Sequence, residues 1–334
     1  MKSHKSTPTT ISVLGGGSWG TALVKILTDN GHRVFWYIRD AAVITHIEQK
    51  QTNPNYLPKL KLSTERLELS TNLKWIVAQS QNLLLAIPSA FIGPVLEKIQ
   101  PQLKNKVVLS AVKGIVPTSE LVVGEHLEKH LQIPKKNIGV IGGPSHAEEV
   151  ARKKLSYLTL AFSSKKQAQL WAERLACDYI RTKAATDTIG IEYAATLKNI
   201  YALAAGIASG LGYGDNFNSV LISQAVREMK RFIRTIYGKK RNINHAAYLG
   251  DLLVTAFSQH SRNRNFGEWI GKGYSVAMTQ DKLKMVAEGF YAVASAVQLN
   301  KGRTDIAIIE AVYAILYLEQ DPKETFEKLA NEIS

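Results

Sequence analysis

Short apolar, β-rich runs alternate with helix-length segments over the first half of this 334-residue chain. The expected strands lie at 11–14, 33–38, 83–87, 107–112, 138–141, 157–162 and 179–182. Nearly continuous apolar strands separated by helices are typical of a mainly parallel, doubly wound sheet that is covered on both faces. The sequence therefore predicts an α/β fold with an N-terminal Rossmann-like sheet.

The pattern changes after Asp187, where the chain becomes rich in alanine and in apolar residues at helical spacing, with few strand candidates. The length also corresponds to about two ordinary domains. We therefore expect a sheet domain over residues 1–187 and an all-α domain over residues 188–334.

Composition excludes several classes of protein. Apolar residues make up 45% and charged residues 21% of the chain, as in ordinary globular proteins. No stretch reaches the ~20 apolar residues of a membrane span, and no apolar core of a secretion signal precedes Ile11. We expect a cytoplasmic protein without stable membrane insertion. Cys177 stands alone, so a buried thiol is expected and a metal site is not.

The formal net charge of +14 favours anionic partners. Nucleic-acid platforms gather their cations on one surface and interleave them with aromatic residues. Here the cations are scattered in short runs: Lys135-Lys136, Lys153-Lys154, Lys165-Lys166 and Lys239-Lys240-Arg241. We interpret most of them as solvated surface, and we expect a phosphorylated small molecule rather than nucleic acid as the partner.

Gly15, Gly17 and Gly20 form a GxGxxG motif between the first expected strand and a helical run, 21–28. The first glycine permits the tight turn, the second lets the backbone approach a pyrophosphate, and the third allows close helix packing. The helix N-terminus attracts the phosphates. The motif predicts dinucleotide binding, and a purely structural turn is the alternative.

Arg39 and Asp40 follow the second expected strand, about twenty residues beyond the glycines. A carboxylate there would bind the ribose 2′-OH of NAD, whereas a guanidinium would pair with the 2′-phosphate of NADP. Our hypothesis is NADP(H), with NAD(H) as a second cofactor. An Arg-Asp pair in a surface turn is the simpler interpretation.

Polar residues also follow later strands, where doubly wound sheets bind their ligands. Lys113 lies between a buried strand and a glycine, which indicates contact with an anion or a carbonyl. Gly143, Ser145 and His146 follow the fifth expected strand. Helix capping alone would also explain that second segment.

Lys198 lies in a helical run whose neighbours three and four residues away are Ala194, Ala195, Tyr201 and Ala202. No carboxylate within the helix can pair with its ammonium, and the small residues suit a buried helix. Because a desolvated lysine has a lowered pKa, it can act as a general acid near neutral pH. The alternative is a lysine whose ammonium reaches water along the surface.

Two polar clusters follow, Asp251 with Thr255 and then the run Ser261-Arg262-Asn263-Arg264. A carboxylate can orient a buried ammonium, and an Arg-Asn pair matches a phosphate dianion. A helix N-cap and a solvated loop are the structural alternatives.

Ten motifs carry a resemblance to the soluble, bacterial type of NAD(P)-dependent glycerol-3-phosphate dehydrogenase. In chain order they are GGGSWGTAL, NPNYLP, IPS, VKGI, GGPSHAEE, DTIGIEYAATLKNI, GLGYGDNF, YLGDLLVT, SRNRNFG and AEGF. The resemblance implies a homodimeric enzyme that reversibly reduces dihydroxyacetone phosphate to sn-glycerol 3-phosphate with NAD(P)H. The product would supply the glycerophospholipid backbone.

The resemblance also implies roles for individual residues. Lys198 would be the general acid/base, and Lys113 and Asp251 would complete the catalytic set. Substrate contacts would come from Lys113, Gly143, Ser145, Asn199, Asp251, Thr255, Ser261, Arg262 and Asn263. Cofactor contacts would come from Gly15, Gly17, Ser18, Trp19, Gly20, Arg39, Lys113, Ala147, Arg262 and Glu288.

The chain departs from the family pattern at two places. Tyr193-Ala194-Ala195 replaces a Gly-Gly-Ala type of stretch, and His146 stands where phenylalanine is common. Two other functions stay open. A related dehydrogenase of branched hydroxy acids or opines could use His146 as its acid, and a non-catalytic NADP(H) sensor would need neither Lys198 nor Asp251.

Overall fold

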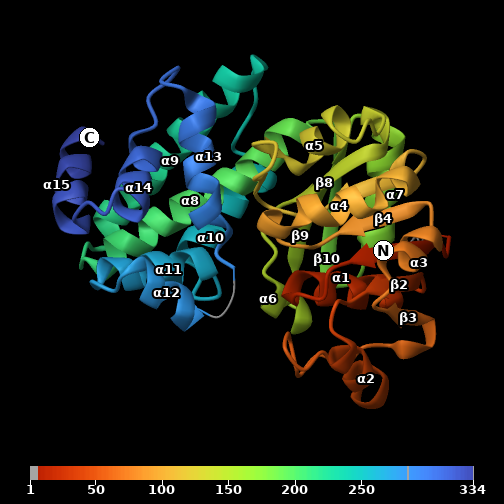
Figure 1. The fold of residues 1–334 in the computed structure, drawn as a ribbon. Helices are drawn as coiled ribbons and strands as arrows, with labels where there is room; N and C mark the ends of the chain where they lie inside the picture. Colours follow the sequence, from red (N-terminus) through yellow and green to blue (C-terminus); the bar gives the residue numbers. More distant parts are fainter. Residues whose placement is uncertain (1–6, 284–285, 334) are drawn as a thin grey trace. The chain divides into compact units, whose positions relative to one another are not determined.

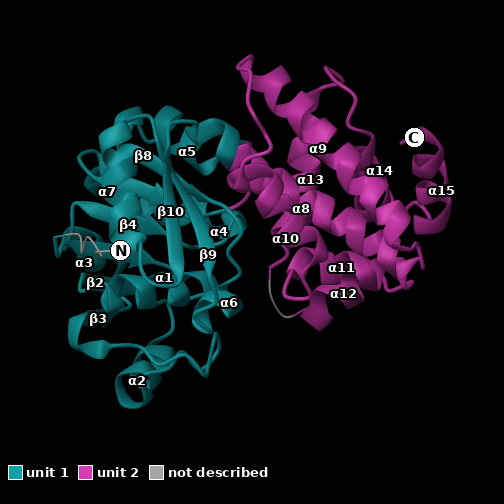
Figure 2. Cartoon of the chain, turned by 180° about the vertical axis from the view of Figure 1, so that it is seen from behind, with its two compact units in different colours: residues 1–112, 121–191 teal, residues 113–120, 192–334 magenta. Residues whose placement is uncertain are grey.

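The computed structural model describes residues 7–283 and 286–333 (Figure 1). The chain divides into two compact units, which Figure 2 distinguishes by colour. Unit 1 comprises Met1–Val112 and Leu121–Ile191, and unit 2 comprises Lys113–Glu120 and Glu192–Ser334. The short segment that begins at Lys113 thus groups with the helical unit, which the sequence pattern did not indicate. The division into domains at residue 187 stays a prediction.

Unit 1 is built on an eight-stranded sheet in the order β10-β9-β8-β5-β4-β1-β2-β3. Its strands are β1 Thr10–Leu14, β2 Arg33–Tyr37, β3 Leu67–Ser70, β4 Asn82–Leu85, β5 Val107–Ser110, β8 Ile138–Gly142, β9 Ser156–Phe162 and β10 Ile180–Ala185. Neighbours are parallel except β8 and β9, which pair antiparallel. The predicted Rossmann-like, mostly parallel sheet is confirmed.

The edge strand β3 was missing from the prediction. Its four residues are all half-buried, and Glu68 and Ser70 interrupt its leucines. An edge strand needs no continuous apolar run, because one of its sides has no neighbouring strand. The central strands were predicted from continuous runs of apolar residues, and β3 has no such run.

Helices cover the sheet of unit 1 on both faces (Figures 1 and 2). They are α1 Ser18–Asp29, α2 Ala41–Lys50, α3 Leu73–Ala78, α4 Ser89–Leu103, α5 Val123–Lys129, α6 Ala147–Ala151 and α7 Lys165–Leu175. Strand β1 is fully buried from Ile11 to Leu14 as a result. Even its Ser12 is satisfied, because the hydroxyl donates to the Ile76 carbonyl of α3 at 2.7 Å.

Unit 2 is helical apart from the two-residue strand β6 Ile115–Val116, and the two-residue strand β7 Leu121–Val122 belongs to unit 1. The helices are α8 Thr188–Gly210, α9 Asp215–Tyr237, α10 Asp251–Phe257, α11 Arg262–Gly271, α12 Val276–Leu283, α13 Glu288–Asn300, α14 Ala307–Tyr317 and α15 Pro322–Glu332. A short π-helical turn, Ala246–Gly250, leads into α10. The predicted all-helical second region is confirmed.

Helices α8 and α11 pack at backbone distance through glycines. A Cβ at Gly206 would lie 2.0 Å from the Arg264 carbonyl oxygen, and one at Gly267 would lie 2.1 Å from that of Leu203. Only glycine permits such an approach without displacement. The contact fixes the N-terminal end of α11 relative to the middle of α8.

Cys177 is half-buried at the margin of the core of unit 1, not fully buried as expected. It lies just beyond α7, in a turn where its backbone exchanges hydrogen bonds with that of Ile180. Burial raises the pKa of its thiol, so the group is protonated at neutral pH.

Two kinds of feature are absent from the described part of the chain. None of its helices combines the length and the apolar character that a membrane crossing requires. No three His, Cys, Asp or Glu side chains come together there as a metal-binding group.

Candidate active site

The glycine motif forms the turn between β1 and α1 of unit 1. Gly15 has a φ of +120°, and a Cβ at Gly20 would lie 2.2 Å from the Gly15 carbonyl oxygen. A Cβ at Gly17, by contrast, would meet no atom within 4 Å. The turn is therefore closed on its protein side and open at Gly17, beside Ser18, where α1 begins. This geometry fits a dinucleotide diphosphate at the helix N-terminus.

Asn53 holds this turn from a distant part of the chain. Its side chain is fully buried, and its amide donates to the Gly16 carbonyl oxygen and to the Thr21 hydroxyl, each at 2.9 Å. Its amide oxygen accepts from the backbone nitrogens of Asn55 and Tyr56. Sequence patterns alone do not predict this role for Asn53. An asparagine inside the NPNYLP motif was the only available signal.

Trp36 supports the same turn from β2. Its indole nitrogen donates to the Gly15 carbonyl oxygen at 2.9 Å, and the ring is fully buried. Trp19, on α1, packs against the hydrophobic core of unit 1. Side chains of the fold therefore fix the backbone of the turn before any ligand binds.

Arg39 and Asp40 differ in their roles beyond β2. The Asp40 carboxylate caps α2 by accepting from the backbone nitrogen of Ala42 at 2.9 Å. The Arg39 side chain is exposed. Because the carboxylate is engaged by its own helix, Arg39 is the better placed of the two to meet a ribose substituent.

The segment after β8 has its own strained turn. Gly143 has a φ of +108°, and the Ser145 hydroxyl donates to its carbonyl oxygen at 3.0 Å. His146 occupies the N-cap position of α6 without a side-chain cap, and Ala147 begins that helix. Capping therefore does not explain Ser145. Helix α6 packs against α1, and Ala147 lies in the hydrophobic core of unit 1.

Lys198 and Asp251 form a buried ion pair in unit 2. The Lys198 ammonium of α8 donates to the carboxylate at the first residue of α10, and the two residues are 4% and 1% exposed. Desolvation lowers the pKa of Lys198 to about 7, against the charge of Asp251, which raises it, while the charge of Lys113 lowers it further. The ammonium can therefore both hold and release a proton near neutral pH.

Three further residues surround this pair. The Thr255 hydroxyl donates to the Asp251 carbonyl oxygen at 2.6 Å, one turn along α10. The Asn199 amide donates to the Lys113 carbonyl oxygen at 3.1 Å, which ties the segment after β5 to α8. The structure thus brings together Lys113, Lys198, Asn199, Asp251 and Thr255, as expected for a shared site.

The Ser261–Asn263 run is the start of α11, not a solvated loop. Ser261 is its N-cap, with the hydroxyl accepting from the Arg264 backbone nitrogen at 3.3 Å. The buried Asn263 accepts from the Gly289 backbone nitrogen at 2.9 Å through its amide oxygen. That bond joins the N-terminal ends of α11 and α13, and Glu288 is the first residue of α13.

Arg262 is exposed and donates to the Val286 carbonyl oxygen at 3.3 Å. It stands where two helix N-termini meet, so its charge adds to the partial positive charge of both ends. An amide donor, a guanidinium and helix-terminal N–H groups are a suitable donor set for a phosphate.

Tyr193, the first of the three departures in α8, has a packing role. It is 1% exposed, and its ring lies 6.3 Å from that of Phe232 and 5.7 Å from that of Tyr237, both on α9. Ala194 and Ala195 are also buried. Tyr193 therefore packs α8 against α9, and the contact between Lys198 and Asp251 is made in its presence.

Almost the whole chain matches known proteins. Residues 10–168 match the family model described as NAD-dependent glycerol-3-phosphate dehydrogenase N-terminus, and residues 187–327 match the corresponding C-terminus. A glycerol-3-phosphate dehydrogenase (NAD(P)+) of Exiguobacterium is 37% identical over 327 residues, covering 96% of this chain and 94% of the relative. The enzyme of that name from Bacillus subtilis is 37% identical over 325 residues, with 96% and 93% covered.

A solved structure agrees with these relatives. The crystal structure of glycerol-3-phosphate dehydrogenase from Coxiella burnetii superimposes with a TM-score of 0.90 at 29% identity, covering 96% of this chain and 98% of that one. Fold, motif order and sequence identity therefore lead to one conclusion. The chain belongs to the NAD-dependent glycerol-3-phosphate dehydrogenase family.

Proposed function

We propose that this chain reduces the C2 carbonyl of dihydroxyacetone phosphate to give sn-glycerol 3-phosphate, reversibly, with Lys198 as the general acid/base. The observation that carries the proposal is the buried Lys198–Asp251 pair, in which the lysine pKa is lowered to about 7. The family and its named relatives support the substrate and the use of NAD(P).

In the reduction, C2 gains a hydride and the carbonyl oxygen gains a proton. The Lys198 ammonium stabilises the negative charge that develops on this oxygen and then gives up its proton to it. Asp251 keeps the ammonium oriented in a site where water is excluded. General acid assistance of this kind contributes typically ~10²–10⁴-fold to the rate. In the reverse direction the neutral amine takes the proton back.

Substrate phosphate is assigned to the joined ends of α11 and α13. Arg262 supplies a guanidinium. The Asn263 amide is oriented because its oxygen accepts from the Gly289 backbone nitrogen, and its NH₂ group is proposed as a donor to the phosphate. Holding the remote phosphate orients C2, so binding energy away from the reacting carbon lowers the barrier. We propose as further substrate contacts Lys113, Gly143, Ser145, Asn199, Thr255 and Ser261.

The dinucleotide is assigned to the open turn of unit 1. Its diphosphate and neighbouring groups would be held by Gly15, Gly17, Ser18, Trp19, Gly20 and Ala147. Arg39 would pair with a 2′-phosphate, which favours NADP(H) over NAD(H) as the second cofactor. When bound in reduced form, the nicotinamide supplies the hydride. We propose as further cofactor contacts Lys113, Arg262 and Glu288.

Consumption of NADPH and of NADH, followed by absorbance in parallel reactions with dihydroxyacetone phosphate, tests this assignment. Rapid oxidation of either cofactor establishes the reaction, and the ratio of the two kcat/KM values tests Arg39. Arg262→Ala should raise KM strongly with a smaller change in kcat. Tight cofactor binding without oxidation would contradict the proposed substrate.

By resemblance we also propose that the active protein is a homodimer and that its product supplies the glycerophospholipid backbone. Light scattering of the purified chain tests the first point, since it separates a dimer from a monomer of 36.9 kDa. Loss of glycerol 3-phosphate in cells that lack the protein tests the second.

A further inference from the structure

A small hollow at the C-terminal end of α9 has an unusual lining. Its volume is about 260 Å³, and it is lined by Lys230, Ile233, Arg234, Lys239, Lys240, Arg241 and Ile243. Five of these seven residues are cationic and none is acidic. None of them belongs to the residues proposed for the reaction. We call this feature the basic hollow.

The chain turns back on itself to make the basic hollow. Helix α9 ends at Gly238, which has a left-handed φ of 47° and donates to the Arg234 carbonyl oxygen at 2.7 Å. The Lys239-Lys240-Arg241 run then returns beside the last turns of the helix, where Arg241 donates to the Lys239 carbonyl oxygen at 3.0 Å. The run noted in the sequence as a scattered basic segment is thus part of a formed hollow.

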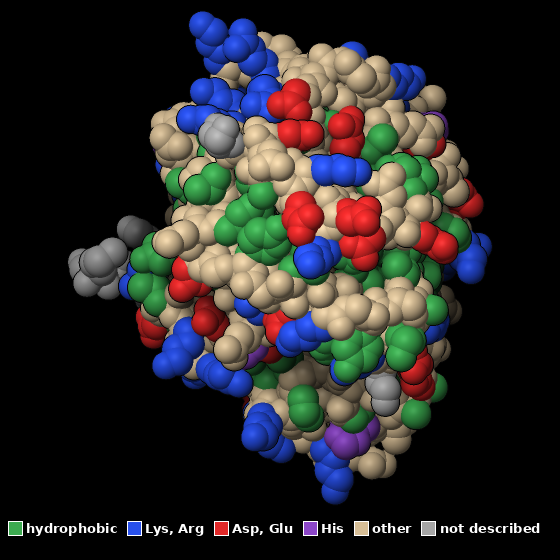
Figure 3. All heavy atoms as spheres, turned by 90° about the vertical axis from the view of Figure 1, so that its left-hand side faces the viewer, with side chains coloured by type: hydrophobic (Ala, Val, Ile, Leu, Met, Phe, Trp, Pro, Cys, Tyr) green, Lys and Arg blue, Asp and Glu red, His purple; other side chains and the backbone are tan. Residues whose placement is uncertain are grey.

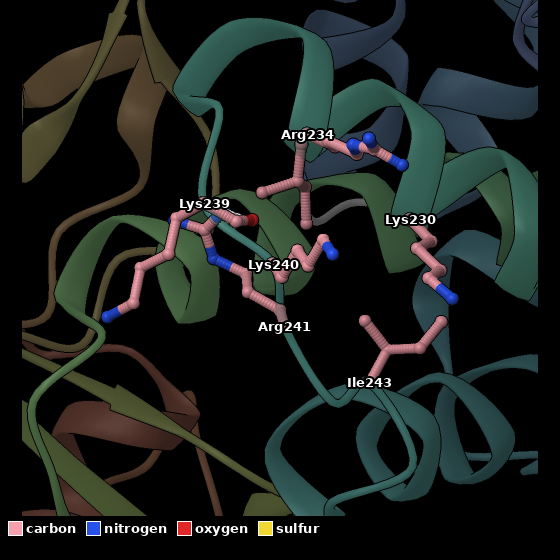
Figure 4. Close-up of a pocket in the computed structure, with 7 residues that line it drawn as sticks. Lys230, Arg234, Lys239, Lys240, Arg241 and Ile243 are labelled. Atoms are coloured by element: carbon pink, nitrogen blue, oxygen red, sulfur yellow. Dashed lines mark hydrogen bonds between the residues drawn. The ribbon is translucent and has the colours of Figure 1, made fainter.

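Three of the cations extend toward one space. In Figure 4, the Lys230 ammonium ends beside Ile243, the Lys240 ammonium points into the same space, and the Arg234 side chain extends toward the Lys230 side of that space, whereas the Lys239 ammonium points away from it. None of the ion pairs found among the described residues of unit 2 involves any of these three. Like charges held near one another without counter-charges repel, and an anion between them would relieve that repulsion.

A second hollow in unit 2 shows what balanced charge looks like. Its volume is about 400 Å³, and its lining includes Arg227 and Arg231 together with Glu228, Asp305 and Glu332. Arg231 pairs with Asp305 at 2.8 Å. Acidic and basic side chains also lie beside one another on the face of unit 2 drawn in Figure 3. The residues that line the basic hollow include no acidic side chain.

We infer that the basic hollow is a second anion site, which binds a compact phosphate-bearing ligand with at least two negative charges. Lysine and arginine donors match phosphate oxygens, and the buried Ile233 and Ile243 provide an apolar floor. The volume lies below the ~300–1,000 Å³ of pockets for drug-sized ligands, which favours a small anion. The C-terminal end of α9 contributes a partial negative charge of about half an elementary charge, which would weaken anion binding. The three positive charges of Lys230, Arg234 and Lys240 exceed it.

The shape argues against a nucleic-acid strand, because such strands need an extended basic groove with stacking aromatic residues. Two sources of a compact phosphate ligand fit the same chemistry: a free phosphorylated molecule and the headgroup of an anionic phospholipid. The experiment distinguishes them.

Calorimetric titration of the whole chain with inorganic tripolyphosphate tests the site. Excess NADP+ is present to occupy the nucleotide turn, and ionic strength is kept at about 0.15 M to screen weak surface contacts. The test variant is Lys230→Ala/Lys240→Ala. The matched control is Lys165→Ala/Lys166→Ala, which removes the same charge from two exposed residues of α7.

We expect saturable binding by the unsubstituted chain, weakened at least about tenfold in the test variant because hydrogen bonds to charged groups are lost. The control should bind within about twofold of the unsubstituted chain, since distant exposed charges contribute little. Absence of binding to the unsubstituted chain, or equal weakening in both variants, would overturn the inference.

Sedimentation with vesicles of phosphatidylcholine and phosphatidic acid, compared with pure phosphatidylcholine, identifies the source. Binding to the anionic vesicles that is lost in the test variant and displaced by tripolyphosphate supports a lipid headgroup. Tripolyphosphate binding without vesicle binding supports a free ligand. Vesicle binding that the test variant retains in full would contradict a role for the basic hollow.

Discussion

The glycine turn of unit 1, Gly15–Gly20, and the buried Lys198–Asp251 pair of unit 2 are constructed in different ways. We call them the nucleotide turn and the lysine centre. The turn is a backbone site, made by a few consecutive residues between β1 and α1. The lysine centre is a side-chain site, made by Lys198 and by Asp251 from a helix 53 residues further along. A backbone site depends on space and on dihedral angles, whereas a side-chain site depends on burial and on charge. The two should therefore fail in different ways.

Removing the Lys198 ammonium should have the largest effect. We expect Lys198→Met to lower kcat by ~10²–10⁴-fold, because the proton donor is lost, and to leave the dissociation constant of NADPH nearly unchanged. Stopped-flow turnover and fluorescence titration of NADPH measure the two quantities. Lys106→Met is the matched control, since Lys106 is also buried but donates to a backbone carbonyl oxygen, that of Ser80, rather than to a carboxylate. A similar loss of kcat in both variants would mean that any buried lysine matters equally.

Gly20→Ala should show the opposite pattern. Its Cβ would lie 2.2 Å from the Gly15 carbonyl oxygen, so the turn must shift. We expect NADPH affinity to fall at least about tenfold, in line with the cost of overpacking, while the pH dependence of kcat stays the same. Gly214→Ala is the control, because a Cβ there meets no atom within 4 Å and its φ is −82°. Unchanged affinity in Gly20→Ala would refute the backbone account.

Asn53→Ala tests whether a distant side chain supports the backbone site. The substitution removes the donors to the Gly16 carbonyl oxygen and to Thr21, and it leaves buried acceptors unsatisfied at a cost of about 1–3 kcal/mol. We expect a lower melting temperature and an NADPH affinity that is weakened less than in Gly20→Ala. Thermal unfolding with and without NADPH separates the two effects. Equal stabilisation by NADPH in variant and parent would show that Asn53 does not act on the turn.

Asp251→Asn, read from the pH dependence of kcat for reduction, should give the smallest effect of these substitutions. Reduction needs protonated Lys198, so kcat should fall as pH rises through about 7. Because the Asp251 charge raises the pKa of Lys198, Asp251→Asn should move this descending limb to lower pH. Profiles of kcat under saturating substrate measure the shift. Movement of the descending limb to higher pH would contradict the expected effect of the Asp251 charge on the pKa of Lys198.

The same contrast explains how much the sequence could predict. Local patterns gave the parallel strands, the glycine turn and the helical second region, because each depends on neighbouring residues. Burial of Lys198 also followed from its alanine neighbours. Its pairing with Asp251 could only be suggested, since no local rule brings α8 and α10 together.

Three features were beyond local patterns. The edge strand β3 lacks an apolar run. Lys113 groups with the helical unit through its bond to Asn199, although it follows a strand of the sheet. Ser261 and Asn263 had been considered for a loop, but they begin α11 and join it to α13. Each of these depends on contacts between residues far apart in the chain.

Titration of the Lys198 side chain by NMR, in the full chain labelled at its lysines, measures the pKa on which the proposed proton transfer depends. Comparison with Lys198→Arg assigns the signal. The account predicts a midpoint near 7, because burial outweighs the charge of Asp251. A midpoint near 10.5, the ordinary value for lysine, would contradict it and would leave Lys198 as a structural cation.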